Sequence, residues 1–73
     1  MVKSIPGEFK VARIKAGLYQ KDLAQKVGIT SNTISQIENG HKSTTGKTAG
    51  AICLALGVRF DDIFKIEQRT NTR

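Results

Sequence analysis

The sequence has few of the residues that build disulfide scaffolds, metal clusters and membrane spans. It contains one cysteine, one histidine, one proline and no tryptophan. A single cysteine excludes an internal disulfide and a multi-cysteine zinc site, and a single histidine excludes a histidine-based metal cluster. No stretch approaches the roughly 20 apolar residues of a membrane span, and no signal-peptide pattern is visible. We therefore expect a cytoplasmic protein with no metal, no cofactor and no membrane contact.

Aromatic and acidic residues are also scarce. Aromatics make up 5% of the 73 residues, and 6 acidic side chains stand against 12 basic ones. The shortage of aromatics predicts one domain with a small aliphatic core of closely packed helices, for which dimerisation is a natural way to bury more surface. The shortage of acidic residues leaves a net charge of +6. That charge favours a polyanion as partner, although many small domains are basic.

Helical periodicity accounts for most of the chain. Apolar residues three and four positions apart, with glycines between the segments, predict five helices. The predicted helices span about residues 8–16, 20–27, 31–39, 46–56 and 60–65. Residues 1–6 are expected to form a mobile arm, and residues 67–73, which lack an apolar anchor, a frayed tail. The sequence therefore predicts a single all-α domain, residues 1–73, without a strand pattern.

Residues 20–39 hold the most informative pattern, two short amphipathic helices joined by a tight turn at Gly28. Ile34 and Ile37 mark the buried side of the second helix. At 100° per residue, the opposite side carries neutral hydrogen-bonding residues. These residues are Asn32, Ser35, Gln36 and Asn39. Such side chains suit the reading of DNA base edges, because Asn and Gln can form two hydrogen bonds to adenine. An ordinary solvated face is the alternative, but this face lacks the usual Lys/Glu pairs.

Glu38 falls at the edge of the buried side of the same helix, where a carboxylate is costly unless it is paired. Arg13, on the inward side of the first predicted helix, is its natural partner. We predict a partly buried Arg13–Glu38 ion pair that joins the two helices. The alternative is two independent surface charges.

The stretch RIKAGLYQKDLAQKVGITSNTISQIENG resembles the helix-turn-helix of phage repressors and Cro proteins, the xenobiotic-response-element family of bacterial regulators. The matching pieces are Arg13, the segments GLYQKDLA and LAQKVGI, Gly28 at the turn and IENG at the end. The resemblance extends over about residues 9–64, since ALGVRFDDIF is similar to the end of that family's domain. It implies a compact five-helix, lambda-repressor-like DNA-binding domain.

The resemblance also implies roles for individual residues. The expected base contacts are Ser31, Asn32, Thr33 and Gln36, of which Thr33 reaches either a base or the backbone. The expected phosphate contacts are Gln20, Ser35, Asn39 and Lys42. The ion pair of the family maps onto Arg13 and Glu38. Three positions depart from the family pattern and leave the packing of residues 46–56 and the dimer surface open. They are Thr44 in place of a common proline, Ala49 in place of a larger aliphatic, and Arg59 in place of a small cap.

Other chemistry finds little support. Gly46, Lys47 and Thr48 resemble the end of a phosphate-binding loop, but the glycine spacing and the preceding helix do not fit that motif. Asp61 and Asp62 suit the first turn of a helix, and no nucleophile–base set exists, so we do not expect an enzyme. Cys53 lies in an apolar run, where a buried inert thiol is favoured over a redox sensor.

The sequence thus predicts a sequence-specific regulator of double-stranded DNA, acting as a repressor and binding a near-palindromic operator as a homodimer. Candidate dimer contacts are Val58, Phe60, Ile63 and Phe64, with burial in the protein's own core as the equal alternative. A controller or antitoxin-type regulator with the same DNA-binding activity stays open, as does a protein-interaction module that uses the same fold. No small-molecule ligand is expected.

Overall fold

The computed structural model describes residues 1–67 as five helices and two short strands. In chain order these are β1 (Val2–Ser4), α1 (Glu8–Lys15), α2 (Gln20–Val27), α3 (Ser31–Glu38), α4 (Gly46–Leu56), α5 (Phe60–Ile63) and β2 (Phe64–Ile66). The first four helices begin at the predicted residues and end within one residue of the prediction, whereas α5 is two residues shorter. Of the predicted frayed tail, residues 67–73, only Glu67 belongs to the described residues; the rest lies outside them.

The start of the chain differs from the prediction. Residues 2–4 were expected within a mobile arm, but they form β1, which pairs antiparallel with β2 and sets Ser4 opposite Phe64. Val2 belongs to the core and is 6% exposed. A strand is recognised in a sequence by apolar residues at every second position, and three residues are too few to establish that alternation. The arm prediction is therefore wrong, and all-α describes the fold only approximately.

The core is aliphatic with two buried aromatics. Every helix contributes at least one side chain with 1% exposure or less; these include Phe9, Leu23, Ile34, Ile52 and Ile63. Phe9 of α1 meets Phe64 of β2 edge to face, with ring centroids 5.8 Å apart. This geometry is a favoured one for aromatic rings, so the C-terminal strand is held against the first helix.

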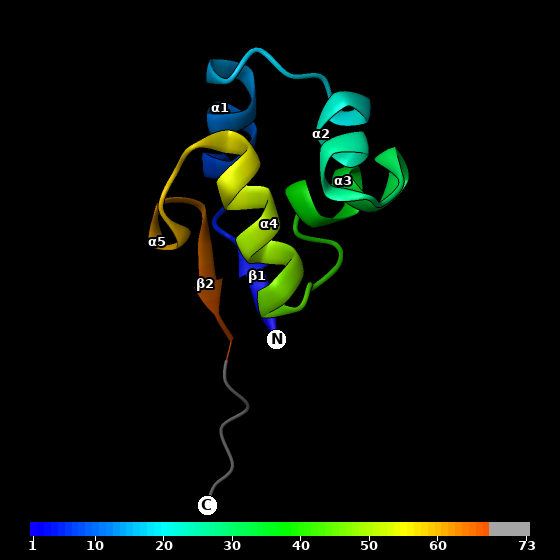
Figure 1. The fold of residues 1–73 in the computed structure, drawn as a ribbon. Coiled ribbons are helices and arrows are strands. Elements are labelled where there is room, and N and C mark those ends of the chain that lie inside the picture. Colours follow the sequence, from blue (N-terminus) through cyan, green and yellow to red (C-terminus); the bar gives the residue numbers. More distant parts are fainter. Residues whose placement is uncertain (68–73) are drawn as a thin grey trace, which may run out of the picture.

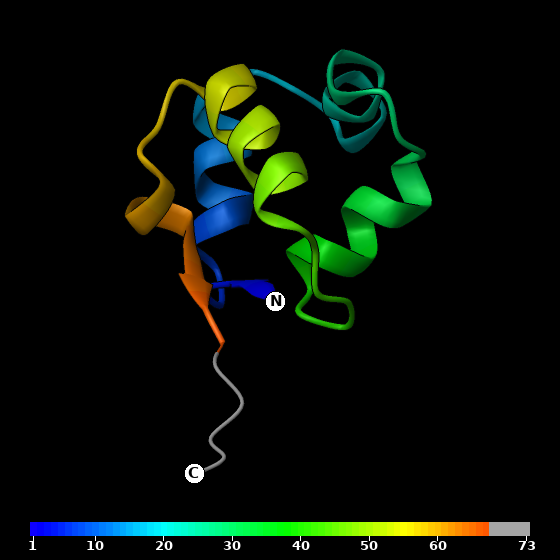
Figure 2. The same cartoon turned by 60° about the horizontal axis from the view of Figure 1, so that its bottom comes forward.

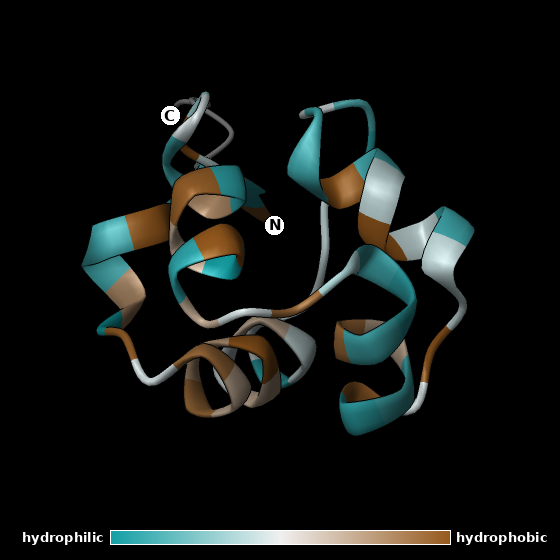
Figure 3. Cartoon of the chain, turned by 90° about the horizontal axis from the view of Figure 1, so that it is seen from above, coloured by the Kyte–Doolittle hydropathy of each residue, from teal (hydrophilic) through white to brown (hydrophobic). Residues whose placement is uncertain are grey.

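Two groups of elements lie on either side of α4. The pair α2 and α3 occupies one side, and α1, α5 and β2 occupy the other, while β1 runs behind α4 in the view of Figure 1 (Figures 1 and 2). Hydrophilic residues colour the outer turns of α2, and its hydrophobic residues face the other helices (Figure 3). The helix-turn-helix therefore projects from one side of the domain.

Cys53 on α4 is buried and free. Burial raises the pKa of its thiol, and the nearby negative charge of Asp62 adds to that rise. A thiol held in its neutral form is a poor nucleophile, which favours the inert role over that of a redox sensor.

Candidate nucleic-acid interface

The turn between α2 and α3 is set by two local features. Gly28 ends α2 with φ of 88°, a left-handed conformation that favours glycine. Thr30 then begins α3 as its N-cap, since its Oγ1 accepts a hydrogen bond from Thr33 N at 3.1 Å. Together they fix the angle at which α3 leaves α2.

The outer face of α3 is polar, as its sequence indicated. Ile34 and Ile37 are buried at 0% and 1% exposure and anchor the helix to the core. Ser31 and Asn32 are exposed at its N-terminal end, and Gln36 is partly exposed one turn further on. The inner and outer faces of α3 are thus separated in the way the helical count predicts.

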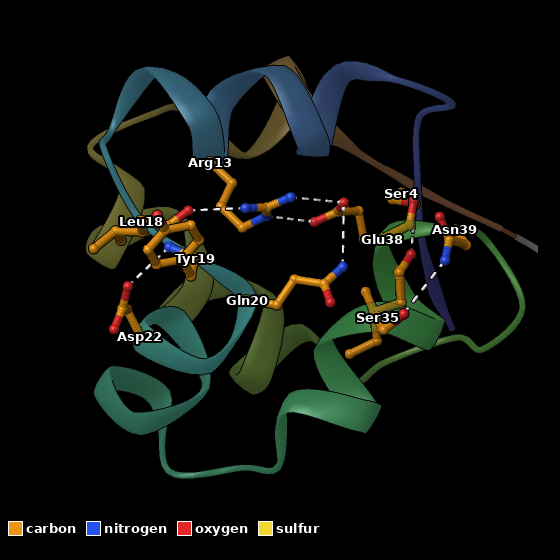
Figure 4. Close-up of polar contacts among 10 residues, drawn as sticks. Ser4, Arg13, Leu18, Tyr19, Gln20, Asp22, Ser35, Glu38 and Asn39 are labelled. Atoms are coloured by element: carbon orange, nitrogen blue, oxygen red, sulfur yellow. Dashed lines mark hydrogen bonds and ion pairs between the residues drawn. The ribbon is translucent and has the colours of Figure 1, made fainter.

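Three of the expected DNA contacts on α3 and its C-cap already have partners within the protein. The hydroxyl of Thr33 lies 2.9 Å from Thr30 Oγ1, so it takes part in the cap of α3. Asn39 donates from Nδ2 to Ser35 Oγ over 3.4 Å, which joins two expected phosphate contacts (Figure 4). The amides of Asn32 and Gln36, in contrast, have no hydrogen bond to another side chain within residues 1–67.

Arg13 and Glu38 form the ion pair expected from the sequence. Arg13 donates from Nε to Glu38 Oε1 at 2.7 Å and from Nη2 to Oε2 at 3.1 Å, and a third bond runs from Nη1 to the carbonyl of Leu18 at 2.8 Å (Figure 4). Both side chains are buried. The hydrogen bond and charge of Glu38 raise the pKa of Arg13 despite the opposing effect of burial. The pair joins α1 to the end of α3.

Gln20 belongs to the same cluster. Its Nε2 donates to Glu38 Oε2 over 3.4 Å, so the first residue of α2 is connected to the last residue of α3 (Figure 4). Tyr19 precedes it as the N-cap, and its backbone N–H bonds to Asp22 Oδ2 at 2.9 Å. The next backbone N–H groups of α2 have no partner within the helix and carry the positive end of its dipole.

An open hollow lies beside this helix start. It is lined by Arg13, Tyr19, Gln20, Lys21 and Ser31. Lys21 supplies an ammonium, Gln20 an amide, and Tyr19 and Ser31 hydroxyls, whereas the charge of Arg13 is balanced by Glu38. These groups, at the start of a helix, are of the kind that bind a phosphate. Sequence analysis missed Tyr19 and Lys21, although their places on either side of Gln20 could have indicated them. Tyr19 is 72% exposed.

Strand β1 supports the C-terminal end of α3, the same end that Arg13 and Gln20 hold through Glu38. Ser4 donates from Oγ to the carbonyl of Ile37 at 2.7 Å, which satisfies a carbonyl in the last turn of the helix. Val2 and Thr44 exchange two backbone hydrogen bonds of 2.9 and 2.8 Å. The loop between α3 and α4, which carries Lys42, is thereby held in place. The prediction of a mobile arm at residues 1–6 gave no supporting role to Val2 or Ser4.

Lys42 lies close to the C-terminal end of α3. The backbone N–H groups of His41 and Lys42 both bond to the carbonyl of Gln36, at 2.8 and 3.2 Å. The side chain of Lys42 is exposed. An expected phosphate contact and an expected base contact are thus joined through the backbone.

The four candidate dimer contacts separate into two pairs. Ile63 and Phe64 are each 1% exposed and belong to the protein's own core, so the proposal that they form a dimer surface is wrong. Val58 and Phe60 are partly exposed and only pack against that core. The physical reason is that Phe64 is the buried residue of β2 and its ring packs against those of Phe9 and Phe60.

Two further features concern the described part of the chain. Among residues 1–67, no group of three or more His, Cys, Asp or Glu side chains is placed to hold a metal ion. No helix there combines the length and the hydropathy needed to cross a membrane.

These features define a helix-turn-helix domain, and comparison with known proteins agrees. Residues 9–63 match the helix-turn-helix family of the Cro/C1 type. The chain belongs to that family, whose members are DNA-binding transcriptional regulators.

Individual relatives are similar over most of their length. One is an uncharacterised HTH-type transcriptional regulator of Methanocaldococcus jannaschii, 38% identical over 60 residues that cover 82% of this chain and 91% of that one. Another is the uncharacterised HTH-type transcriptional regulator YgzD of Bacillus subtilis, 32% identical over 59 residues that cover 81% and 89%. The crystal structure of the clp gene regulator ClgR from C. glutamicum shares the fold. Its TM-score is 0.69 at 24% identity, over 75% of this chain and 71% of that chain.

Proposed function

We propose that this protein is a sequence-specific transcriptional regulator of double-stranded DNA, most simply a repressor that binds its operator as a homodimer. The observation that carries the proposal is the outer face of α3. Neutral amide and hydroxyl side chains project there, while Gln20 and Lys42 stand near its C-terminal end, Gln20 through its hydrogen bond to Glu38. The relatives named above are described as transcriptional regulators, which supports the same role.

Binding would begin with electrostatic attraction. The net charge of +6 draws the protein to the phosphate backbone. This contribution falls as the salt concentration rises, because releasing counterions into concentrated salt gains less free energy. A phosphate would then sit in the hollow lined by Tyr19, Gln20 and Lys21, with a second near Lys42, beyond the C-terminal end of α3. Such contacts set the register of the protein on the duplex without reading sequence.

Base reading would follow from α3 in the major groove. Ser31 and Asn32 lie at the N-terminal end of the helix, which contacts base edges in this motif. Asn32 and Gln36 can each pair with adenine through two hydrogen bonds, and Ser31 can contact several bases. Thr33 and Ser35 would contribute through the backbone or a phosphate, since their hydroxyls already have partners within the protein. Asn39 would contact a phosphate from the C-cap of α3.

A homodimer would place two copies of α3 in successive major grooves, about 34 Å apart, on a near-palindromic site. Val58 and Phe60 stay as candidate contacts for that dimer, because both are partly exposed. Repression by blocking the polymerase fits a regulator of this size, and a controller or antitoxin-type regulator would use the same DNA-binding surface.

A salt-titrated binding assay tests the proposal against a protein-interaction module with the same fold. The protein is titrated with a duplex selected from random DNA and with a scrambled duplex of equal composition. A regulator binds the selected duplex typically at least about 10³-fold more tightly, and affinity falls with rising salt. Equal, weak binding to both duplexes would instead support the interaction module.

A further inference from the structure

Helix α1 exposes two large apolar side chains on the side away from the core. Val11 is 47% exposed and Ile14 is 58% exposed, whereas Phe9 on the same helix is fully buried. At 100° per residue, Val11 and Ile14 lie about 30° to either side of the outward direction of the helix. Together they form an apolar strip along α1 that no part of residues 1–67 covers.

Two opposite charges flank this strip on one side. Glu8 and Lys15 are exposed and seven residues apart, so they occupy equivalent positions two turns along the helix. Neither forms an ion pair among the described residues, where the salt bridge is that of Arg13 and Glu38. A hollow of about 320 Å³ borders the same flank, lined by Glu8, Val11 and Lys15 of α1 and by Val58 and Asp62 opposite.

This arrangement is complementary to itself. Consider two copies of α1 that lie antiparallel, related by a two-fold axis that passes midway between positions 11 and 12. Each residue then lies opposite the residue of the partner whose number makes the sum of the two numbers 23. Glu8 then lies opposite the partner's Lys15, and Lys15 opposite the partner's Glu8. Val11 lies within about 1 Å of the axis along the helix, so it meets the partner's Val11. Lys10, on the opposite flank, extends into solvent.

We propose that the outer face of α1, formed by Glu8, Val11, Ile14 and Lys15, is a contact surface for a second copy of this chain. In the hollow beside it, Glu8 and Asp62 lie with Lys15. The partner's Lys15 can therefore approach carboxylates, while the partner's Glu8 approaches the ammonium of Lys15. Electrostatic complementarity of this kind fixes the register and direction of a contact.

The contact is separate from the DNA-binding surface. The outer face of α1 contains none of the residues expected to touch DNA, and α2 and α3 lie on the other side of α4 (Figure 2). Two copies that meet through α1 keep both of their α3 faces open. An eight-residue helix buries less than the roughly 1,200 Å² of a standard interface, so the association is expected to be weak. It allows copies bound to different DNA sites to come together.

Charge reversal tests the proposal on the full chain. Sedimentation of the wild-type protein over a concentration series, up to about 1 mM, is expected to show reversible association. Glu8→Lys and Lys15→Glu should each weaken that association about tenfold or more, because each change sets like charges opposite one another. The double variant Glu8→Lys/Lys15→Glu should restore it. Circular dichroism and binding to a single half-site duplex confirm that each variant is folded.

Cross-linking supplies an independent readout. In a Cys53→Ser background, Val11→Cys should cross-link to a second copy with a short bis-maleimide, whereas the matched control Lys26→Cys on α2 should not. A wild-type protein that stays monomeric throughout the series would overturn the proposal. So would an association that neither single reversal weakens and that Val11→Cys does not capture, because the copies would then meet elsewhere. Sequence-specific DNA binding could persist in both cases, so failure here is distinct from failure of the proposed function.

Discussion

Gln20 and Glu38 share a hydrogen bond of 3.4 Å from Nε2 to Oε2, so the first residue of α2 is fixed to the last residue of α3. The same carboxylate accepts the guanidinium of Arg13 from α1. A side chain proposed to hold a DNA phosphate is therefore tied to the helix proposed to read bases. Any change in this cluster should affect the stability of the fold and the placement of both DNA contacts.

The first prediction concerns that cluster. Glu38→Gln leaves the buried guanidinium of Arg13 without its carboxylate, and loss of one partner from a buried ion pair typically costs about 3–5 kcal/mol. We expect urea unfolding to report a decrease of that order in the free energy of unfolding. The control Glu67→Gln changes an exposed acid and should shift stability by no more than about 0.5 kcal/mol. Equal effects of the two changes would show that the pair is not a structural clamp.

A second prediction compares two glycines. Gly28 has φ of 88°, so Gly28→Ala forces a left-handed alanine and should destabilise the domain by about 1–2 kcal/mol. Gly50 lies inside α4, where an added Cβ would have no atom within 4 Å apart from its chain neighbours and the nearby backbone of its own helix. Gly50→Ala should therefore stabilise the domain by about 0.5–1 kcal/mol. Thermal unfolding of both variants checks these opposite signs; a gain from Gly28→Ala would be inconsistent with the turn described here.

A third prediction follows from β1. Val2→Ala removes buried methyl groups from the core and should lower the free energy of unfolding by about 2 kcal/mol. Lys3→Ala, on the opposite face of the same strand, is the matched control and should change it little. Chemical denaturation distinguishes the two. If the start of the chain were a mobile arm, both changes would be neutral.

A fourth prediction concerns pH and Cys53. Burial, followed by the charge of Asp62, raises the pKa of this thiol. Because the folded pKa lies above the unfolded one, the stability linked to this group is complete below the unfolded value. It is lost as pH rises through the folded value. Alkylation by iodoacetamide, followed by mass spectrometry, should thus be slower in the folded protein than in urea across the neutral and mildly alkaline range. Equal rates in both states would favour a reactive, redox-sensing thiol.

A fifth prediction separates reading from positioning. Gln36→Ala should weaken binding to a selected operator by about 1–3 kcal/mol and relax the preference at one base pair. Lys42→Ala should weaken all sequences alike and reduce the salt dependence. Titrations with a set of single-base operator variants measure both effects. An unchanged affinity and preference in the Gln36 variant would refute the assignment of α3 as the reading helix.

The helices could be predicted because the spacing of apolar residues is a local pattern. The central ion pair could be predicted because a partly buried carboxylate needs a cation, and one inward-facing basic residue was available. The spacing of Ile34 and Ile37 sets the orientation of α3, and a carboxylate at the edge of that buried side requires a cation such as Arg13. The strands could not be predicted, because β1 exists only through its pairing with β2 at the other end of the chain. For the same reason the sequence left open whether Phe64 is surface or core.

The candidate site shows a similar division. Residues on the outer face of α3 follow from helical geometry, but the hollow beside Gln20 depends on how α1, α2 and α3 meet. Tyr19 and Lys21 flank Gln20 within the matched segment GLYQKDLA, but only the folded arrangement shows that both line the hollow. Ser4 acts on the carbonyl of Ile37 across 33 positions of the chain, a contact that local patterns do not reveal.

Selection of bound duplexes from random DNA tests whether α3 reads sequence in two half-sites of one operator. We predict an enriched, near-palindromic site whose two half-sites are centred about 10 base pairs apart, one helical turn of DNA. In the Gln36→Ala variant the same site should be enriched with the preference at one base pair of each half-site relaxed. Recovery of random sequence with no preferred half-site or spacing would contradict the prediction.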